Sequence, residues 1–113
     1  MKLPNILSFH ASDAGIIYEL LVPAELEYFN GHFPGTPILP GVVQIGWAQS
    51  FTDRQQLLQG HVYKLEQLKF QAVIVPGDKV ILRLQLDPIK NNVVFSFESV
   101  RGRHSSGRIV YGS

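Results

Sequence analysis

A stretch rich in glycine and proline, residues 28–41, limits what this chain can fold into more than any other part of the sequence. It holds three prolines and three glycines in fourteen residues. Proline fixes one backbone dihedral angle and lacks an N–H donor, whereas glycine adopts conformations that are closed to other residues. Such a stretch fits neither a regular helix nor a central strand, so we expect a long loop of fixed, irregular shape.

The segment after this loop, residues 42–58, is predicted to be a helix that is buried on most of its sides. Apolar residues recur at positions 43, 47, 51 and 58 and again at 42, 45 and 48. This spacing follows the helical period of about 3.6 residues. The first half of the segment carries no charge, so we expect the helix to reach solvent at Asp53 and Arg54 and to end at Gly60.

The rest of the sequence is predicted to form strands. Residues 14–22 are expected to be a strand that ends at Pro23, because proline cannot donate to a strand ladder. Four more strands, joined by short turns, are expected at 62–71, 80–87, 93–98 and 108–111. One strand, a long loop, one buried helix and four further strands favour an α+β fold in which an antiparallel sheet wraps around one long helix. Residues 1–113 are expected to form this single domain.

Composition excludes several classes of protein. The chain has no cysteine, which rules out disulfides, thiolate nucleophiles and cysteine-ligated metals. Its net charge of +1 gives no basis for nucleic-acid binding. The longest uncharged stretch, residues 28–52, is too polar for a membrane span, and residues 1–5 lack the apolar core of a signal peptide. We therefore expect a cytoplasmic protein, and an apolar content of 45% in so short a chain favours self-association.

Two residues of the loop and its exit can carry chemistry. His32 is the one loop side chain that titrates near neutral pH, at about 6.5 for an ordinary histidine, so it can act as a base or an acid. Gly41 opens the helix, where N–H groups lack intrahelical partners and can polarise an enolate-like or thioester oxygen. A candidate base and a candidate oxyanion site thus lie nine residues apart. Taken singly, a lone loop histidine is more often a hydrogen-bonded surface group, and a helix that starts after Pro-Gly is ordinary.

The twelve residues that begin at this glycine-histidine pair resemble the signature of the hot-dog-fold 3-hydroxyacyl-(acyl carrier protein) dehydratases. They read Gly31-His32-Phe33-Pro34-Gly35-Thr36-Pro37-Ile38-Leu39-Pro40-Gly41-Val42. Lys69-Phe70, Val75-Pro76-Gly77-Asp78 and the last strand, Gly107-Arg108-Ile109-Val110-Tyr111, also resemble the family pattern, so the resemblance covers about residues 16–111. The short N-terminus and the run at 37–44, followed by Trp47-Ala48, are most similar to the small dehydratases of aryl-polyene biosynthetic clusters.

This resemblance implies a site with two proton-transfer groups. His32 would abstract the proton α to the thioester carbonyl, and the N–H of Gly41 would polarise that carbonyl. In the family, a carboxylate six residues after the helix-opening proline helps to protonate the departing 3-hydroxyl group, and the partner chain of a dimer supplies it. That position is Gly46 here, so the chain departs from the family at the catalytic acid. Asp53 lies about 10 Å further along the helix, which is too far for a simple replacement.

The resemblance also implies the substrate and the partners. The substrate would be a 3-hydroxyacyl thioester carried on the phosphopantetheine arm of an acyl carrier protein or on coenzyme A, with no bound cofactor and no metal. The chain would form a homodimer or a higher oligomer of dimers, with an acyl tunnel at the dimer interface. Core packing explains the aromatic members of the predicted tunnel lining equally well. The residues predicted to contact substrate are Tyr28, Phe29, Gly31, Phe33, Ile38, Val42 and Trp47.

Gly46 leaves several interpretations open. The chain can be a dehydratase relative with a weakened or altered mechanism. It can instead be a thioesterase, or a non-catalytic subunit that binds acyl carrier protein in a heteromeric dehydratase, because one fold hosts several activities. A natural or deliberate mutation can also have removed the acid. A glycine at this position would otherwise serve tight helix packing or a wider tunnel.

The remaining candidates are basic. Residues 53–113 carry nine basic against five acidic groups. Arg101, Arg103 and Arg108 surround Gly102 and a predicted turn at residues 105–106, and this cluster either docks an acidic carrier protein or is simply solvated. His10, His61 and His104 share no metal-ligand spacing with the loop histidine and are expected at the surface or on edge strands.

Overall fold

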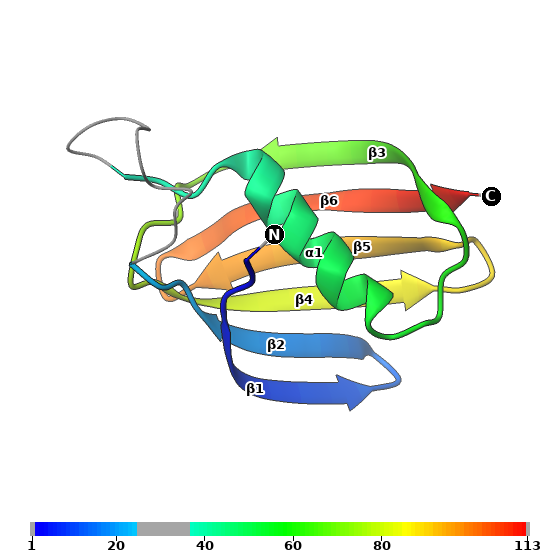
Figure 1. Ribbon diagram of the computed structural model, residues 1–113, viewed down its shortest axis with the longest axis horizontal. Helices are drawn as coiled ribbons and strands as arrows, with labels where there is room; N and C mark the ends of the chain where they lie inside the picture. The colour runs from blue at the N-terminus through cyan, green and yellow to red at the C-terminus, as the bar shows by residue number, and fades with distance from the viewer. Residues whose placement is uncertain (1, 25–36, 113) are drawn as a thin grey trace.

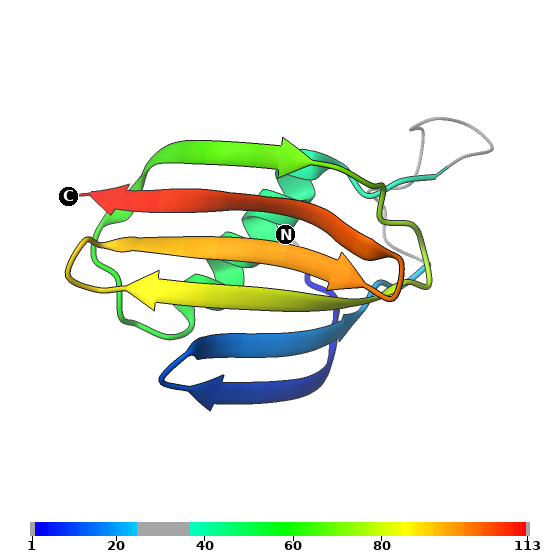
Figure 2. The same cartoon turned by 180° about the vertical axis from the view of Figure 1, so that it is seen from behind.

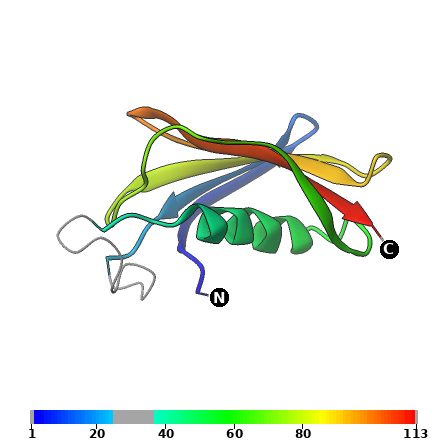
Figure 3. The ribbon, with the colours of Figure 1, turned by 90° about the horizontal axis from the view of Figure 1, so that it is seen from above.

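A computed structural model describes residues 2–24 and 37–112, and these residues form one sheet and one helix. The sheet is antiparallel, has the strand order β1-β2-β4-β5-β6-β3, and curves around helix α1 (Gly41–Asp53) (Figures 1 and 3). Within the described residues, no helix covers the other face of the sheet (Figure 2). The predicted α+β class, with a curved antiparallel sheet on one central helix, is confirmed. The strands are β1 (Asn5–Ser12), β2 (Gly15–Leu21), β3 (His61–Phe70), β4 (Lys79–Asp87), β5 (Asn92–Ser99) and β6 (Gly102–Gly112).

The core lies between the helix and the concave face of the sheet. Along β2, β4 and β5 the apolar core side chains stand at every second position, as the period of two predicts. On α1 the buried positions follow a spacing of three and four, so one stripe of the helix faces the sheet. The largest fully buried side chains include Trp47, Phe51, Phe95, Phe97, Leu20, Ile74, Leu82, Leu84 and Ile109.

Strand β1 was not predicted from the sequence. All eight of its residues are exposed, so it has no buried face and no alternation of apolar and polar residues. It pairs with β2 across a tight turn in which the N–H of Ala14 donates to the hydroxyl of Ser12 at 3.2 Å. Two strands therefore precede the loop, where the sequence indicated one.

Helix α1 is shorter than predicted, because it ends at Asp53 and not near Gly60. The N–H of Gln55 bonds to the carbonyl of Thr52, and Gln56 has a positive φ of 56°, which no right-handed helix allows. Leu57 is about half exposed, and Leu58 packs against the core from a segment that is no longer helical.

Strand β6 begins at Gly102, so the predicted turn at residues 105–106 is wrong. Ser105 lies opposite Phe97 within the sheet, and the connection from β5 is made at residues 100–101. The prediction that His104 lies at the surface is also wrong, since its side chain is fully buried. The register shifts beside it, and a bulge of this kind can turn a side chain inward against the strand alternation.

Candidate functional site

The candidate site is the start of α1. Pro40 precedes the helix in an extended conformation, no side chain caps the end, and the first turn carries no acidic residue. The first helical bonds run to the carbonyl of Pro40 from the N–H groups of Val43, at 3.1 Å, and Gln44, at 3.2 Å. Among the described residues, nothing accepts a hydrogen bond from the N–H groups of Gly41 and Val42. This end of the helix therefore presents free donors where the helix dipole favours negative charge.

The segment after β3 holds the helix start in place. The N–H of Leu39 donates to the carbonyl of Ile74 at 2.7 Å, and both side chains are buried. The N–H groups of Gln71 and Ala72 donate to the carbonyl of His104 at 2.9 and 3.3 Å. The entry to the helix is thus anchored to β6 through residues 71–74, and the end of β3 lies beside the start of α1 (Figure 1).

The structure brings three of the predicted site residues together. Gly41 and Val42 form the first turn of α1, with Val42 73% exposed, and Ile38 lies half-buried just before it. Trp47 is fully buried, and its indole N–H donates to the carbonyl of Lys2 at 3.0 Å, so in this chain it belongs to the core. Five predicted residues lie outside the described ones: Tyr28, Phe29, Gly31, His32 and Phe33.

Gly46 lies half-buried inside α1 and presents no polar side chain to the site. Asp53 is the one acidic residue of this helix, and it stands at the opposite end. Its carboxylate accepts a 2.7 Å hydrogen bond from the hydroxyl of Tyr111. Distance and this contact together keep Asp53 from taking the place of an acid at Gly46.

Two residues near the helix start were not assigned a role from the sequence. Gln44 is almost completely buried, and its side-chain amide donates to the carbonyl of Leu39 at 3.2 Å, so it braces the end of the loop. Phe70, the last residue of β3, lies against Gly41: a Cβ built on Gly41 would be 2.8 Å from both Cε1 and Cζ of the Phe70 ring. The Lys69-Phe70 pair was the only sequence signal for this contact.

The predicted arginine cluster does not exist as a unit. Arg101 makes a forked ion pair with Asp78, at 2.9 and 2.8 Å, and also reaches the carbonyl of Val73. This hydrogen bond from Arg101 is the main reason why the pKa of Asp78 lies below its ordinary value. Arg103 and Arg108 lie on β6 without an ion-pair partner among the described residues.

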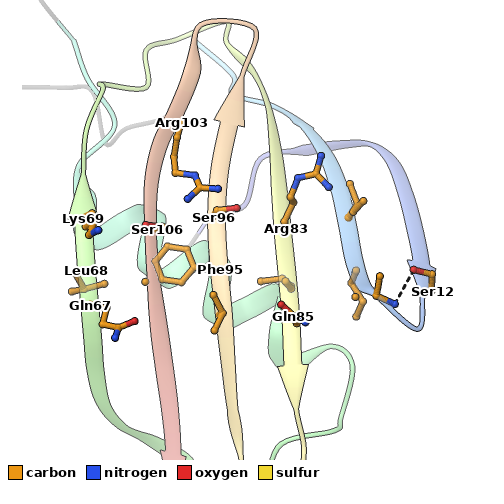
Figure 4. A pocket seen from close by; sticks show the side chains of 17 residues that line it. Ser12, Gln67, Leu68, Lys69, Arg83, Gln85, Phe95, Ser96, Arg103 and Ser106 are labelled. Atoms are coloured by element: carbon orange, nitrogen blue, oxygen red, sulfur yellow. Dashed lines mark hydrogen bonds between the residues drawn. The ribbon is translucent and has the colours of Figure 1, made fainter.

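A depression of about 720 Å³ lies on the outer face of the sheet (Figure 4). Arg83 and Arg103 flank Ser96 in it, from β4 and β6, and Lys69 lies beyond on β3 (Figure 4). Among the described residues, none of those predicted for catalysis or substrate binding lines it, whereas Arg103, a candidate for docking a carrier protein, does. It is therefore separate from the candidate site, which faces the helix side of the sheet.

Residues 2–24 and 37–112 hold neither a membrane-spanning helix nor a cluster of metal ligands. There, no helix is long and apolar enough to cross a membrane. In the same part of the chain, no three histidine or carboxylate side chains gather closely enough to hold a metal ion.

A curved antiparallel sheet wrapped on a single helix, with an open helix start at its end, defines this chain as a hot-dog-fold protein. The family model of ApeI-like proteins, described as ApeI dehydratase, matches residues 8–108. The chain therefore belongs to the ApeI-like dehydratase family, as the motif at residues 31–42 indicated.

Solved structures agree with this assignment. The dehydratase heterocomplex ApeI:P from Xenorhabdus doucetiae contains a chain that is 28% identical, with a TM-score of 0.88 and 97% of both chains covered. An uncharacterized protein from Erwinia carotovora subsp. atroseptica is 32% identical, with a TM-score of 0.84, and the match covers 96% of this chain and 95% of that one.

Curated relatives are 3-hydroxyacyl-(acyl-carrier-protein) dehydratases named FabZ. The one from Ligilactobacillus salivarius is 39% identical over 75 residues, which cover 59% of this chain and 53% of the relative. The one from Chloroflexus aggregans is 37% identical over 82 residues, which cover 66% of this chain and 57% of the relative. The chain thus spans about half the length of the curated relatives it matches.

Proposed function

We propose that this chain is a subunit of a cytoplasmic dehydratase that removes water from 3-hydroxyacyl thioesters. The observation that carries the proposal is the uncapped start of α1, whose free N–H groups belong to Gly41 and Val42, the last two residues of the dehydratase motif. A thioester oxygen bound there would receive hydrogen bonds where negative charge develops. Membership of the ApeI-like family supports the same reaction.

In the proposed reaction His32 removes a proton from C2 of the thioester. The electron pair spreads onto the carbonyl oxygen, where the N–H of Gly41 and the helix dipole stabilise it. It then forms the C2–C3 double bond while the C3–O bond breaks, and the departing hydroxyl group takes up a proton and leaves as water. The products are an enoyl thioester and one water molecule. The second proton needs a donor that Gly46 does not provide.

We further propose that a second hot-dog chain provides this donor. One structural relative is part of a dehydratase heterocomplex of two kinds of chain, and a homodimer of the present chain would contain Gly46 twice and no acid in either place. The free edge of β3 suits such a contact, because it is an outer strand of the sheet with Tyr63 and Leu65 exposed. The names of the curated relatives support an acyl carrier protein as the bearer of the substrate.

The direct test is enoyl-thioester formation, followed by mass spectrometry as the loss of one water from a 3-hydroxyacyl thioester. The chain as written, His32→Ala and Gly46→Asp are compared, with His10→Ala on the exposed strand β1 as a matched control. We expect little turnover from the original and a gain of about 100-fold or more from Gly46→Asp, the range of general acid catalysis. High activity of the original that is lost in His32→Ala would overturn the missing-acid proposal alone. If neither the original chain nor any variant forms enoyl thioester, the dehydratase proposal is wrong.

A complementation experiment tests whether two chains share the site. The chain as written has the base without the acid, and the double variant His32→Ala/Gly46→Asp has the acid without the base. Neither alone completes a site, but a mixed dimer would contain one complete site. Activity that appears only on mixing supports a shared site, and no activity from a mixture shown to form dimers contradicts it.

A further inference from the structure

The aromatic ring of Phe70 packs on the backbone of Gly41, and about half of the Phe70 side chain is exposed. It is 51% exposed, in contrast to Phe95 and Phe97 of the same sheet, which are fully buried. It is not part of the core cluster. Its ring lies on Gly41 at the start of α1, and the bonds that anchor residues 71–74 fix the strand end that carries it.

The contact explains why position 41 is glycine. Gly41 is the first residue of a right-handed helix, a conformation that any L residue adopts, so the backbone does not require glycine there. A Cβ there would lie 2.8 Å from two ring atoms of Phe70 and 3.3 Å from a third, so the ring of this half-exposed side chain would have to shift to admit one. The glycine therefore makes room for an aromatic ring beside the free N–H.

The open part of the ring borders the place where the substrate carbonyl would be held. A carbonyl oxygen within about 3 Å of the N–H of Gly41 has its C2 carbon only two bonds away. Val42, beside it, is exposed, so neither residue of the first turn fills this space with a side chain. A ring fixed against Gly41 thus limits the width available next to C2 and keeps water from one side of the developing oxyanion.

From this geometry we infer that Phe70 is a specificity-determining residue: its ring forms the wall beside Gly41 that excludes thioesters with a substituent on C2. The inference rests on the proposed function for the identity of the ligand. The packing of Phe70 on Gly41 does not rest on it, so the two are tested separately.

The specificity test compares 3-hydroxybutanoyl with 2-methyl-3-hydroxybutanoyl N-acetylcysteamine thioester. Phe70→Ala, Phe70→Leu and Phe9→Ala are made in the most active form of the protein; Phe9 is the matched control, because it is 52% exposed on β1 at the opposite edge of the sheet. A misplaced methyl group in an apolar pocket typically changes kcat/KM by 10- to 200-fold. We expect Phe70→Ala to reduce the preference for the unbranched substrate by about 10-fold, Phe70→Leu to reduce it less, and Phe9→Ala to leave it unchanged.

Two results would overturn the role of Phe70 in specificity. One is an unchanged preference in a Phe70→Ala protein that unfolds at the original temperature. The other is dissociation of the assembly in Phe70→Ala, seen by sedimentation, since Phe70 would then be an interface residue. If no form turns over, the proposed function fails, and the same preference is measured as a ratio of dissociation constants by calorimetry.

The packing test uses thermal unfolding and needs no activity. In the original chain Gly41→Ala should lower the melting temperature, because the new Cβ meets the ring. In Phe70→Ala the same substitution should leave the melting temperature unchanged or raise it, because alanine favours helix more than glycine does. An equal effect of Gly41→Ala in both backgrounds would contradict the contact and with it the inference.

Discussion

The hydroxyl of Tyr111 donates a 2.7 Å hydrogen bond to the carboxylate of Asp53 and so joins the last strand to the last residue of α1. The Tyr111 side chain is almost fully buried, so the bond is shielded from water on one side. We expect Tyr111→Phe to lower the free energy of unfolding by about 1.5 to 3 kcal/mol, as for a hydrogen bond to a charged group. Urea unfolding measures this. Tyr63→Phe, at a 73% exposed position, is the control and should change nothing.

The same tyrosine should make the protein sensitive to alkali. Burial, aided by the hydrogen bond to Asp53, raises the pKa of Tyr111 above its ordinary value of 10.0. The unfolded chain therefore releases this proton at a lower pH than the folded chain does. Its contribution to stability is complete below about pH 10 and is lost as the pH rises further. Between about pH 9 and pH 11 the urea midpoint should fall more steeply in the original chain than in Tyr111→Phe, and equal slopes would exclude this contribution.

The secondary structure could be predicted wherever one face of an element is buried. Strand β4 alternates fully buried Leu82 and Leu84 with exposed Arg83, and its limits were found to within one residue. Strand β1 was missed because the sheet buries none of its residues, so the sequence holds no alternation to recognise. The end of α1 was misplaced because the apolar pair at 57–58 continues the helical spacing of apolar residues. The positive φ of Gln56, which ends any helix before that pair, cannot be recognised from this spacing.

The forked ion pair between Arg101 and Asp78 should make stability fall in acid. The hydrogen bond from Arg101, with that from the N–H of Val75, holds the pKa of Asp78 below its ordinary value of 3.8. Because the pKa of Asp78 is lower in the folded chain, this carboxylate stabilises the fold at pH values above its pKa in the unfolded chain. The stabilisation is lost as the pH falls through its pKa in the folded chain. The loss in urea midpoint from about pH 6 to pH 3 should be smaller in Arg101→Gln than in the original chain. Arg108 has no ion-pair partner among the described residues, so in Arg108→Gln the urea midpoint should fall in acid as much as it does in the original chain.

The candidate site could be predicted from local sequence only in part. The free N–H groups at Gly41 follow from a proline and a glycine before an apolar helix, so the motif was sufficient. Phe70 reaches Gly41 from a strand 29 positions further along the chain, and such a contact depends on the sheet order that places β3 at the edge. The burial of His104 likewise depends on a register shift, which no periodic pattern reveals.

His104 should act as a structural support of the candidate site. One ring nitrogen lies 2.7 Å from the hydroxyl of Ser99 and the other 3.3 Å from the carbonyl of Ala72. The carbonyl can only accept, so the Nδ1–H of the ring points to Ala72. We expect His104→Leu to cost about 2 to 4 kcal/mol of unfolding free energy, because two polar partners lose their bonds and the core must repack.

A double-mutant cycle with Ser99→Ala separates the hydrogen bond from the repacking. Ser99→Ala alone should cost about 1 kcal/mol, and less in the His104→Leu background, where the Ser99 hydroxyl keeps only the 3.2 Å bond from the N–H of Arg101. The segment after Phe70 is hydrogen-bonded to the main-chain carbonyl of His104. A shift of β6 at His104 should therefore also displace the Phe70 ring that lies on Gly41. His104→Leu should therefore weaken the preference for unbranched thioesters, while His10→Leu on exposed β1 should not. If the unfolding free-energy costs of His104→Leu and Ser99→Ala are additive and the preference for unbranched thioesters is unchanged, His104 neither bonds to Ser99 nor supports the site.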